Sequence, residues 1–268
     1  MGDPVPDRIA AYFEAVDRGH VERALEQLAP QVLVALPPKG GHEVDPRRVA
    51  RGREEVGRLL REREPEAARH QVVLCVAEGP SCMVEGLYRN AADEATRTFT
   101  AAFRLGADLR IERYVAFACE PAVALPPRAD SPPKAGSAWA AVERYFHALD
   151  EGLFEEAADQ FSADVLYCHP PYRHTGITSN RRVDFNGREP LLAAFRERGK
   201  TVFHHRVLEL IQRGPNALFE AVVEGLPDGG TGSAVCSLSL DDDGRIHRYV
   251  AFYTEPGVPR ETLPPPTG

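Results

Sequence analysis

The chain has 268 residues, of which 43% are hydrophobic and 27% charged, and a formal net charge of −8. This length suffices for one large domain or two ordinary domains, each with its own hydrophobic core. Because the negative charge repels a polyanionic backbone, we expect no nucleic-acid partner.

The cysteines and the N-terminal residues indicate in which cellular compartment the protein is expected. The five cysteines are an odd number without paired spacing, which argues against a disulfide scaffold. The opening segment MGDPVPDRIAAYF has no basic stretch followed by an apolar run, and no segment has the length and apolar character of a membrane span. We therefore expect a cytoplasmic protein that does not enter a membrane.

The first predicted elements are two short helices within residues 9–25, where apolar residues recur every three or four positions and the pattern breaks at 17–19. A short strand at 32–38 follows and is stopped by its two prolines, which cannot donate to a strand ladder. After a polar loop, residues 52–64 predict a third helix.

Four strand-like runs come next, separated by turn-forming residues. They lie at residues 70–79, 81–88, 98–105 and 110–117. Helices first and a meander of strands after them predict an α+β unit with an antiparallel sheet.

The second half of the chain repeats this pattern in the same order and at nearly the same spacing. The matched segments are YFEAVDRG and YFHALDEG at 12–19 and 145–152, GRE at 52–54 and 187–189, Gly-Pro at 79–80 and 214–215, and RIERYVAF and RIHRYVAF at 110–117 and 245–252. We interpret the chain as a tandem duplication of one domain.

This duplication predicts the domain organisation. We place the first domain at residues 1–122, a proline-rich, semi-rigid linker at 123–139, the second domain at 140–258 and a disordered tail at 259–268. Fusion holds two copies of one dimer surface at high effective concentration, so we expect an intramolecular pseudodimer whose two sheets pack on each other. Further homo-oligomerisation stays open.

The order of two helices, a short strand ending before proline, a third helix and a four-strand meander resembles the nuclear transport factor 2-like superfamily. Its members include ketosteroid isomerase, scytalone dehydratase, limonene epoxide hydrolase and the SnoaL-like polyketide cyclases. The resemblance covers nearly all of residues 8–122 and 141–257. It implies two tandem cone-shaped α+β domains, each with N-terminal helices packed on a curved antiparallel sheet. The superfamily contains both enzymes and binding or assembly modules, so the fold alone does not give the function.

The resemblance also implies candidate catalytic positions. Ketosteroid isomerase uses a tyrosine, a base that precedes a proline and an acid on the third meander strand to stabilise an oxyanion. The residues at these positions are Tyr145, His169 and Cys236 in the second domain and Tyr12, Leu36 and Ala101 in the first. Because leucine and alanine cannot move a proton, the resemblance implies an active second domain and a degenerate, mainly structural first domain.

Further ionisable residues surround His169 in the second copy. Neighbouring residues on a strand face opposite sides, so only one of His204 and His205 can point into the cone, and Cys168 faces away from it if His169 faces inward. His205 and Glu220 have counterparts in the first copy, which favours an architectural role for them. The residues peculiar to the second copy are His169, Tyr172, His174 and His204.

These comparisons give the candidate site. A histidine suits proton transfer because its unperturbed pKa lies near neutral pH. We predict His169, Tyr145, Cys236 and His204 as catalytic residues, and Tyr172, His174, His205, Glu220 and Arg182 as substrate-binding residues. Arg182 could bind a carboxylate, or it could form a structural ion pair, because the first copy also has arginines at the matching positions.

Three classes of function remain open. The first is a cofactor-independent enzyme that performs isomerisation, cyclisation, dehydration or epoxide opening on a small molecule of secondary metabolism. The second is a metal-dependent enzyme with His169, His174, His204 and Glu220 as ligands, although no H-E-x-x-H or paired-cysteine motif is present. The third is a non-catalytic ligand-binding or assembly module, in which His169 only fills the cone.

Overall fold

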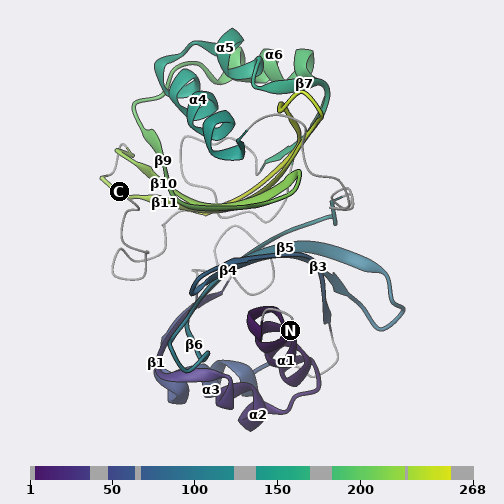
Figure 1. Cartoon of the computed structure of the whole chain (residues 1–268), viewed down its shortest axis with the longest axis vertical. Helices are drawn as coiled ribbons and strands as arrows, with labels where there is room; N and C mark the ends of the chain where they lie inside the picture. The colour runs from purple at the N-terminus through teal and green to yellow at the C-terminus, as the bar shows by residue number, and fades with distance from the viewer. Residues whose placement is uncertain are drawn as a thin grey trace. The chain divides into compact units, whose positions relative to one another are not determined.

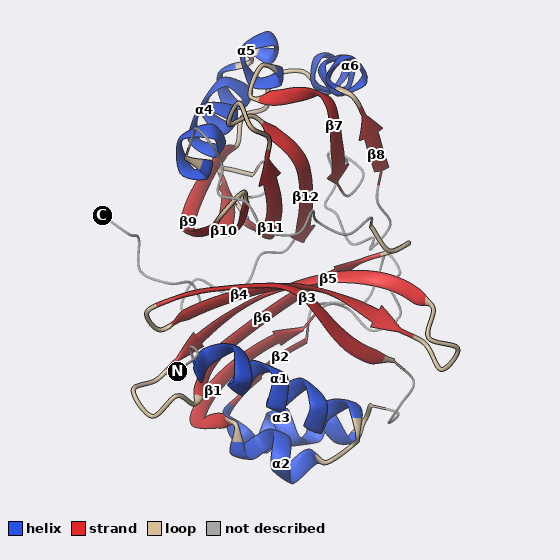
Figure 2. Cartoon of the chain, turned by 45° about the vertical axis from the view of Figure 1, so that its right-hand side comes forward, coloured by secondary structure: helices blue, strands red, loops and turns tan. Residues whose placement is uncertain are grey.

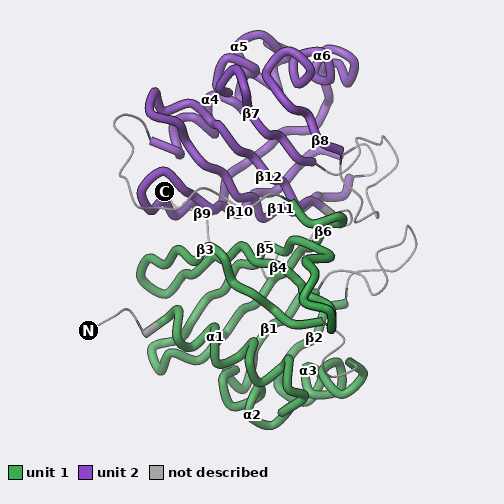
Figure 3. The backbone as a smooth tube through the Cα atoms, turned by 90° about the vertical axis from the view of Figure 1, so that its right-hand side faces the viewer, with its two compact units in different colours: residues 1–123 green, residues 124–268 purple. Residues whose placement is uncertain are grey.

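A computed structural model describes residues 4–36, 48–63, 68–123, 137–169, 183–226 and 229–254. The chain divides into two compact units, Met1–Val123 and Ala124–Gly268, coloured separately in Figure 3. Most of the predicted linker, the predicted tail and the loop that carries Tyr172, His174 and Arg182 lie outside the described residues.

Both units have the same order of helices and strands, shown in Figure 1. The first unit consists of α1 (Pro4–Asp17), α2 (Val21–Glu26), β1 (Leu28–Leu36), β2 (Arg48–Arg51), α3 (Gly52–Arg61), β3 (Arg69–Glu78), β4 (Ser81–Arg89), β5 (Ala95–Leu105) and β6 (Ile111–Cys119). The second consists of α4 (Ala138–Glu151), α5 (Phe154–Ala158), β7 (Phe161–His169), β8 (Val183–Asn186), α6 (Arg188–Arg198), β9 (His204–Arg213), β10 (Asn216–Glu224), β11 (Gly232–Leu240) and β12 (Ile246–Thr254).

Each unit forms one six-stranded sheet, in the order β2-β1-β6-β5-β4-β3 and β8-β7-β12-β11-β10-β9. The predicted meander of four antiparallel strands is confirmed in both units. The sheets are nevertheless mixed, because β1 pairs in parallel with β6, and β7 with β12. The long connection between these strands, which contains the helices and the other strands, permits the parallel pairing.

The edge strands β2 and β8 were not predicted. Each has four residues and pairs antiparallel with the first strand of its unit, β2 with β1 and β8 with β7. Strands this short give little periodicity, because their sequences, RVAR and VDFN, contain only two hydrophobic residues each.

In each unit the helices cover one face of the curved sheet (Figure 2). Helix α1 buries Ile9, Tyr12, Phe13 and Val16, which recur every three or four residues, against alternate residues of the strands. Helix α4 does the same in the second unit and ends at Gly152, whose positive φ of 77° is the left-handed cap conformation that glycine adopts without strain. The α+β cone architecture predicted for both halves is confirmed.

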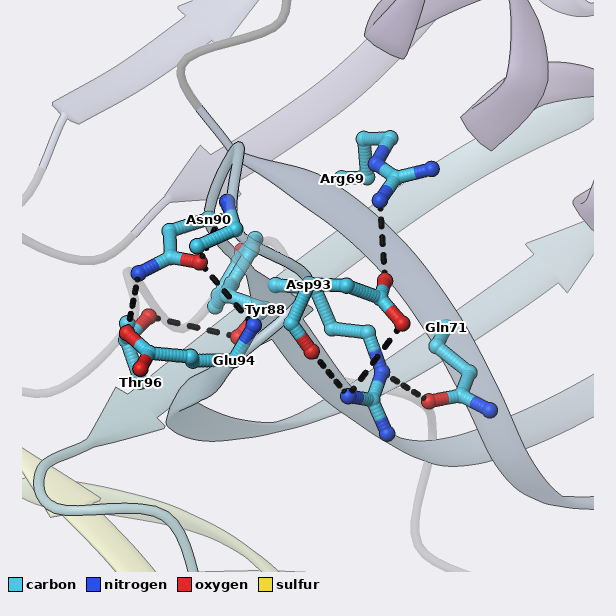
Figure 4. A network of polar contacts seen from close by, with 9 residues as sticks. Arg69, Gln71, Tyr88, Asn90, Asp93, Glu94 and Thr96 are labelled. Atoms are coloured by element: carbon cyan, nitrogen blue, oxygen red, sulfur yellow. Dashed lines mark hydrogen bonds and ion pairs between the residues drawn. The ribbon is translucent and has the colours of Figure 1, made fainter.

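A network of polar side chains holds the turn between β4 and β5 (Figure 4). Asn90 Oδ1 accepts hydrogen bonds from the backbone N–H groups of Ala92 and Glu94, at 3.0 and 2.9 Å. The carboxylate of Asp93 lies 2.8 Å from Arg69, and the backbone oxygen of Asp93 accepts from Arg89. The exposed charges of Asp93, Arg69 and Arg89 are thus paired with one another, and Asn90 donates to the Glu94 carboxylate at 2.9 Å.

The helices within the described ranges include none that is both long and apolar enough to cross a membrane.

Candidate functional site

The second unit encloses a cavity of about 400 Å³ between its helices and the inner face of its sheet. This volume lies in the range of small-molecule sites, which are mostly apolar with a few polar groups. The lining residues are Tyr145, Phe146, Leu149, Tyr167, His169, Val183, Phe185, Ala194, Glu197, Arg198, Thr201, Phe203, His205, Ala221, Val223, Ala234, Cys236, Tyr249, Ala251 and Tyr253.

In the first unit, two aromatic rings occupy the corresponding space. Strand register identifies the equivalent positions: Tyr88 is paired with His70 as Val223 is with His205, and Phe99 is paired with Gly86 as Ala234 is with Ala221. The rings of Tyr88 and Phe99 contact each other, with centroids 4.9 Å apart. The cavity of the second unit therefore exists because valine and alanine replace tyrosine and phenylalanine.

Gly86 is part of this packing. A Cβ atom at Gly86 would lie 2.4 Å from the Phe99 ring, well inside van der Waals contact. In the second unit the opposing residue is Ala234, and Ala221 takes the place of the glycine. A phenylalanine on β5 thus requires glycine at the paired position of β4, whereas alanine at the equivalent position of β11 permits alanine on β10.

A carboxylate and a histidine form a hydrogen-bonded pair at one end of the cavity. Asp150, in the last turn of α4, lies 2.6 Å from Nδ1 of His205 and accepts the His205 backbone N–H at 2.7 Å. A carboxylate accepts hydrogen bonds, so Nδ1 carries a proton and Nε2 of a neutral His205 is the acceptor. The first unit has the same pair in Asp17 and His70, at 2.6 and 2.7 Å.

The two histidines differ in what surrounds them. His70 is packed between Phe13, at 4.4 Å between centroids, and the rings of Tyr88 and Phe99, at 4.8 and 5.3 Å. This burial lowers the pKa of His70 below its usual value, despite the hydrogen bond with Asp17. Its side chain is 3% exposed, against 14% for His205, which lines the cavity. Toward the core, His70 is therefore covered by the rings of Tyr88 and Phe99, whereas His205 faces a cavity. On their other side, Asp17 and His70 line a separate hollow of the first unit.

Tyrosine hydroxyls and a cysteine thiol form a second polar cluster in the cavity wall. The hydroxyl oxygens of Tyr145 and Tyr167 lie 2.9 Å apart and are buried, and the Tyr167 ring stacks on Tyr249 at 4.9 Å. Tyr249 donates a long hydrogen bond, 3.7 Å, to the Cys236 sulfur. Burial raises the pKa of the Cys236 thiol to about 12, so this group stays protonated near neutral pH.

His169 lies at the end of β7 on the same face as Tyr167. Its ring is nearly parallel to Tyr167 at 6.1 Å and to Tyr253 at 6.4 Å. Cys168 is buried but does not line the cavity, as expected from the alternation of side chains along a strand. The Tyr253 ring lies over Gly232, where a Cβ would come within 2.2 Å of it.

Two predicted residues do not line the cavity. His204 is exposed and faces outward, because the Asp150 hydrogen bonds turn its neighbour His205 inward and strand residues alternate. Glu220 is buried on the opposite face of the sheet from its neighbours Phe219 and Ala221, which belong to the inner core. We therefore remove both from the candidate site.

The three predicted metal ligands that the structure describes, His169, His204 and Glu220, are not brought together. Of the four predicted ligands, only His169 lines the cavity among the residues that the structure describes, and His174 lies outside them together with Tyr172 and Arg182. Within the described ranges no group of three or more His, Cys, Asp or Glu side chains is close enough to hold a metal ion.

Several residues of the site were missed at the sequence level: Asp150, Tyr167, Arg198, Phe203, Tyr249 and Tyr253. Asp150, Arg198 and Tyr249 have identical counterparts in the first unit, so a search for residues peculiar to the second copy could not find them. Tyr167 could have been found, because it lies two positions before His169 on a strand and so shares its face.

Comparisons with known proteins found similar solved structures that each cover about half of this chain. No family model and no curated protein matches the chain. A "putative ketosteroid isomerase" from Kribbella flavida is 26% identical, with 48% of this chain and 88% of that chain covered and a TM-score of 0.34. An NTF-2 like protein of unknown function from Burkholderia xenovorans is 13% identical, with 45% and 86% covered and a TM-score of 0.36.

A SnoaL-like protein of unknown function from Burkholderia thailandensis is 19% identical, with 44% and 98% covered and a TM-score of 0.33. Each match spans about half of this chain and most of the other chain.

Proposed function

We propose that the second domain is an enzyme that performs general acid–base chemistry on a small molecule in its cavity, without a cofactor. The proposed reaction begins with removal of a proton from carbon next to a carbonyl group. Isomerisation, cyclisation and dehydration can all start from the enolate that this step produces.

His205 is the proposed base. Asp150 holds the proton on Nδ1, so the lone pair of Nε2 can take the proton from the substrate carbon. The electron pair of the broken C–H bond moves to the carbonyl oxygen, and Asp150 stabilises the imidazolium that results. An imidazole works near neutral pH because its ordinary pKa lies close to it.

The tyrosine pair is the proposed donor to the developing oxyanion. The Tyr145 and Tyr167 hydroxyls lie 2.9 Å apart and both residues line the cavity, so a hydroxyl that turns toward a bound substrate can donate to its oxyanion. His169, the second imidazole of the wall, is proposed to return a proton to the substrate, and Cys236 contributes a neutral thiol.

The observation that carries this proposal is the difference between the two copies of one hydrogen-bonded pair. The rings of Tyr88 and Phe99 cover the core-facing side of His70, whereas His205 lines a cavity of about 400 Å³. A structural role of the pair does not require that His205 line a cavity, whereas a catalytic role does.

Deuterium exchange tests the proposal directly. The full chain is incubated in D₂O with a set of cyclic and aromatic ketones, and deuterium incorporation next to the carbonyl is followed by mass spectrometry. We expect His205→Gln to lower the exchange rate by ~10²- to 10⁴-fold, as for loss of one general base. His70→Gln is the matched control, because it alters the same pair in the first domain, and it should leave the rate unchanged.

Equal rates in the wild type and His205→Gln, in protein that is folded by circular dichroism, would contradict the assignment. Binding of these ketones without exchange in the wild type would instead favour the non-catalytic binding module.

A further inference from the structure

The cavity wall contains a permanent cation, Arg198, at the end of α6. A guanidinium stays protonated at all ordinary pH values. The Arg198 side chain is half-buried, with Nε and Nη2 shielded from solvent, whereas the acidic lining residue next to it, Glu197, is exposed. The electrostatic field inside the cavity therefore has a fixed positive contribution from one wall.

The equivalent arginine of the first unit has a structural role. Nη2 of Arg63 lies 3.1 Å from Oδ1 of Asp17 and donates to the carbonyl oxygen of Ala68 at 2.5 Å. Arg63 thereby connects the segment that follows α3 to the carboxylate of Asp17. In the second unit the position of Ala68 is taken by Phe203.

Phe203 connects the cation with the proposed base. The guanidinium carbon of Arg198 lies 5.8 Å from the centroid of the Phe203 ring. The same ring meets His205 edge-on, with centroids 5.6 Å apart. Arg198 and His205 both line the cavity and both contact this one ring, so one small ligand in the cavity can reach both side chains.

We infer that Arg198 selects substrates that carry a carboxylate, such as small 3-oxo acids. This inference rests on the proposed function and names its substrate class. The planar guanidinium can donate two parallel hydrogen bonds to a carboxylate, which fixes orientation as well as charge. A carboxylate held there directs the neighbouring acidic C–H bond toward His205.

The test uses pairs of carboxylic acids and their methyl esters of a size that fits the cavity. Dissociation constants are measured by ligand-observed NMR at pH 7.5, where the acids are ionised. We expect the wild type to bind acids about 10- to 100-fold more tightly than the matched esters. Arg198→Gln should remove this preference and leave ester affinity within about twofold, and Arg198→Lys, which retains the charge without the planar fork, should restore part of it.

Arg196→Gln is the matched control. Arg196 lies on the same helix, is exposed and forms an ion pair with Glu155 at 2.5 Å, so its loss should not change the preference. Equal affinity of acids and esters, or an unchanged preference in Arg198→Gln, would overturn the inference. If ketone exchange still depends on His205 in that case, the proposed function stands while its substrate class is wrong.

Discussion

His169 and Leu36 occupy the same position in two copies of one strand. Leucine fits there in the first domain, so an apolar side chain is compatible with the end of this strand. We expect His169→Leu to fold normally and to lower turnover by ~10²- to 10⁴-fold, because it removes one proton-transfer group. Exchange rates and thermal melting of the same protein samples check this, and an active, stable His169→Leu protein would mean that the ring only fills space.

Cys236 provides a residue-scale test of burial. Its thiol pKa of about 12 leaves almost no thiolate at pH 8, and the thiolate is the reactive form. Alkylation of Cys236 by iodoacetamide should therefore be much slower in the folded protein than in urea-unfolded protein, and should accelerate as the pH rises toward 12. Peptide mass spectrometry gives the rate at this residue. Similar rates in folded and unfolded protein at pH 8 would contradict the buried, neutral thiol.

At the scale of strands, the packing of β4 against β5 depends on a residue pair. In Gly86→Ala the new methyl group would meet the Phe99 ring, and overpacking of this kind costs about 1–3 kcal/mol of unfolding free energy. The matched change in the second domain, Ala221→Gly, faces Ala234 and should cost only about 0.5–1 kcal/mol through backbone entropy. Urea unfolding of both variants compares the two costs. A smaller loss for Gly86→Ala would contradict the filled interior of the first domain.

Most elements could be predicted because the duplication shows each pattern twice. The helices follow from three- and four-residue spacing of apolar residues, and the meander follows from runs of strand-forming residues between turns. The edge strands and the parallel pairing could not be predicted, since a four-residue strand has little pattern and strand partners depend on the whole topology.

The site was predictable only in part. Tyr145, His169 and Cys236 line the cavity, and they were located from the resemblance and the alternation along strands. The choice between His204 and His205 needed the Asp150 hydrogen bonds. The cavity itself depends on Val223 and Ala234, which are ordinary apolar residues whose importance appears only beside the aromatic rings of the first domain.

At the scale of the whole chain, the duplication leads us to expect a fused pseudodimer. Residues 1–125 and 138–268, produced as separate proteins, should therefore associate with each other or self-associate. Light scattering after size-exclusion chromatography measures this. Two well-behaved fragments that stay monomeric alone and in mixture would contradict the expectation.

We propose that the second domain is active because its cavity lacks the two aromatic rings, Tyr88 and Phe99, that fill the first domain. The triple variant Ala221→Gly, Val223→Tyr and Ala234→Phe gives the second domain the filling residues of the first. The direct measurement is deuterium exchange into ketones by this variant, beside Ala221→Gly alone as a control for the glycine. We predict a folded protein whose exchange falls to the uncatalysed rate while the control remains active. A folded triple variant that exchanges at the wild-type rate would contradict the account.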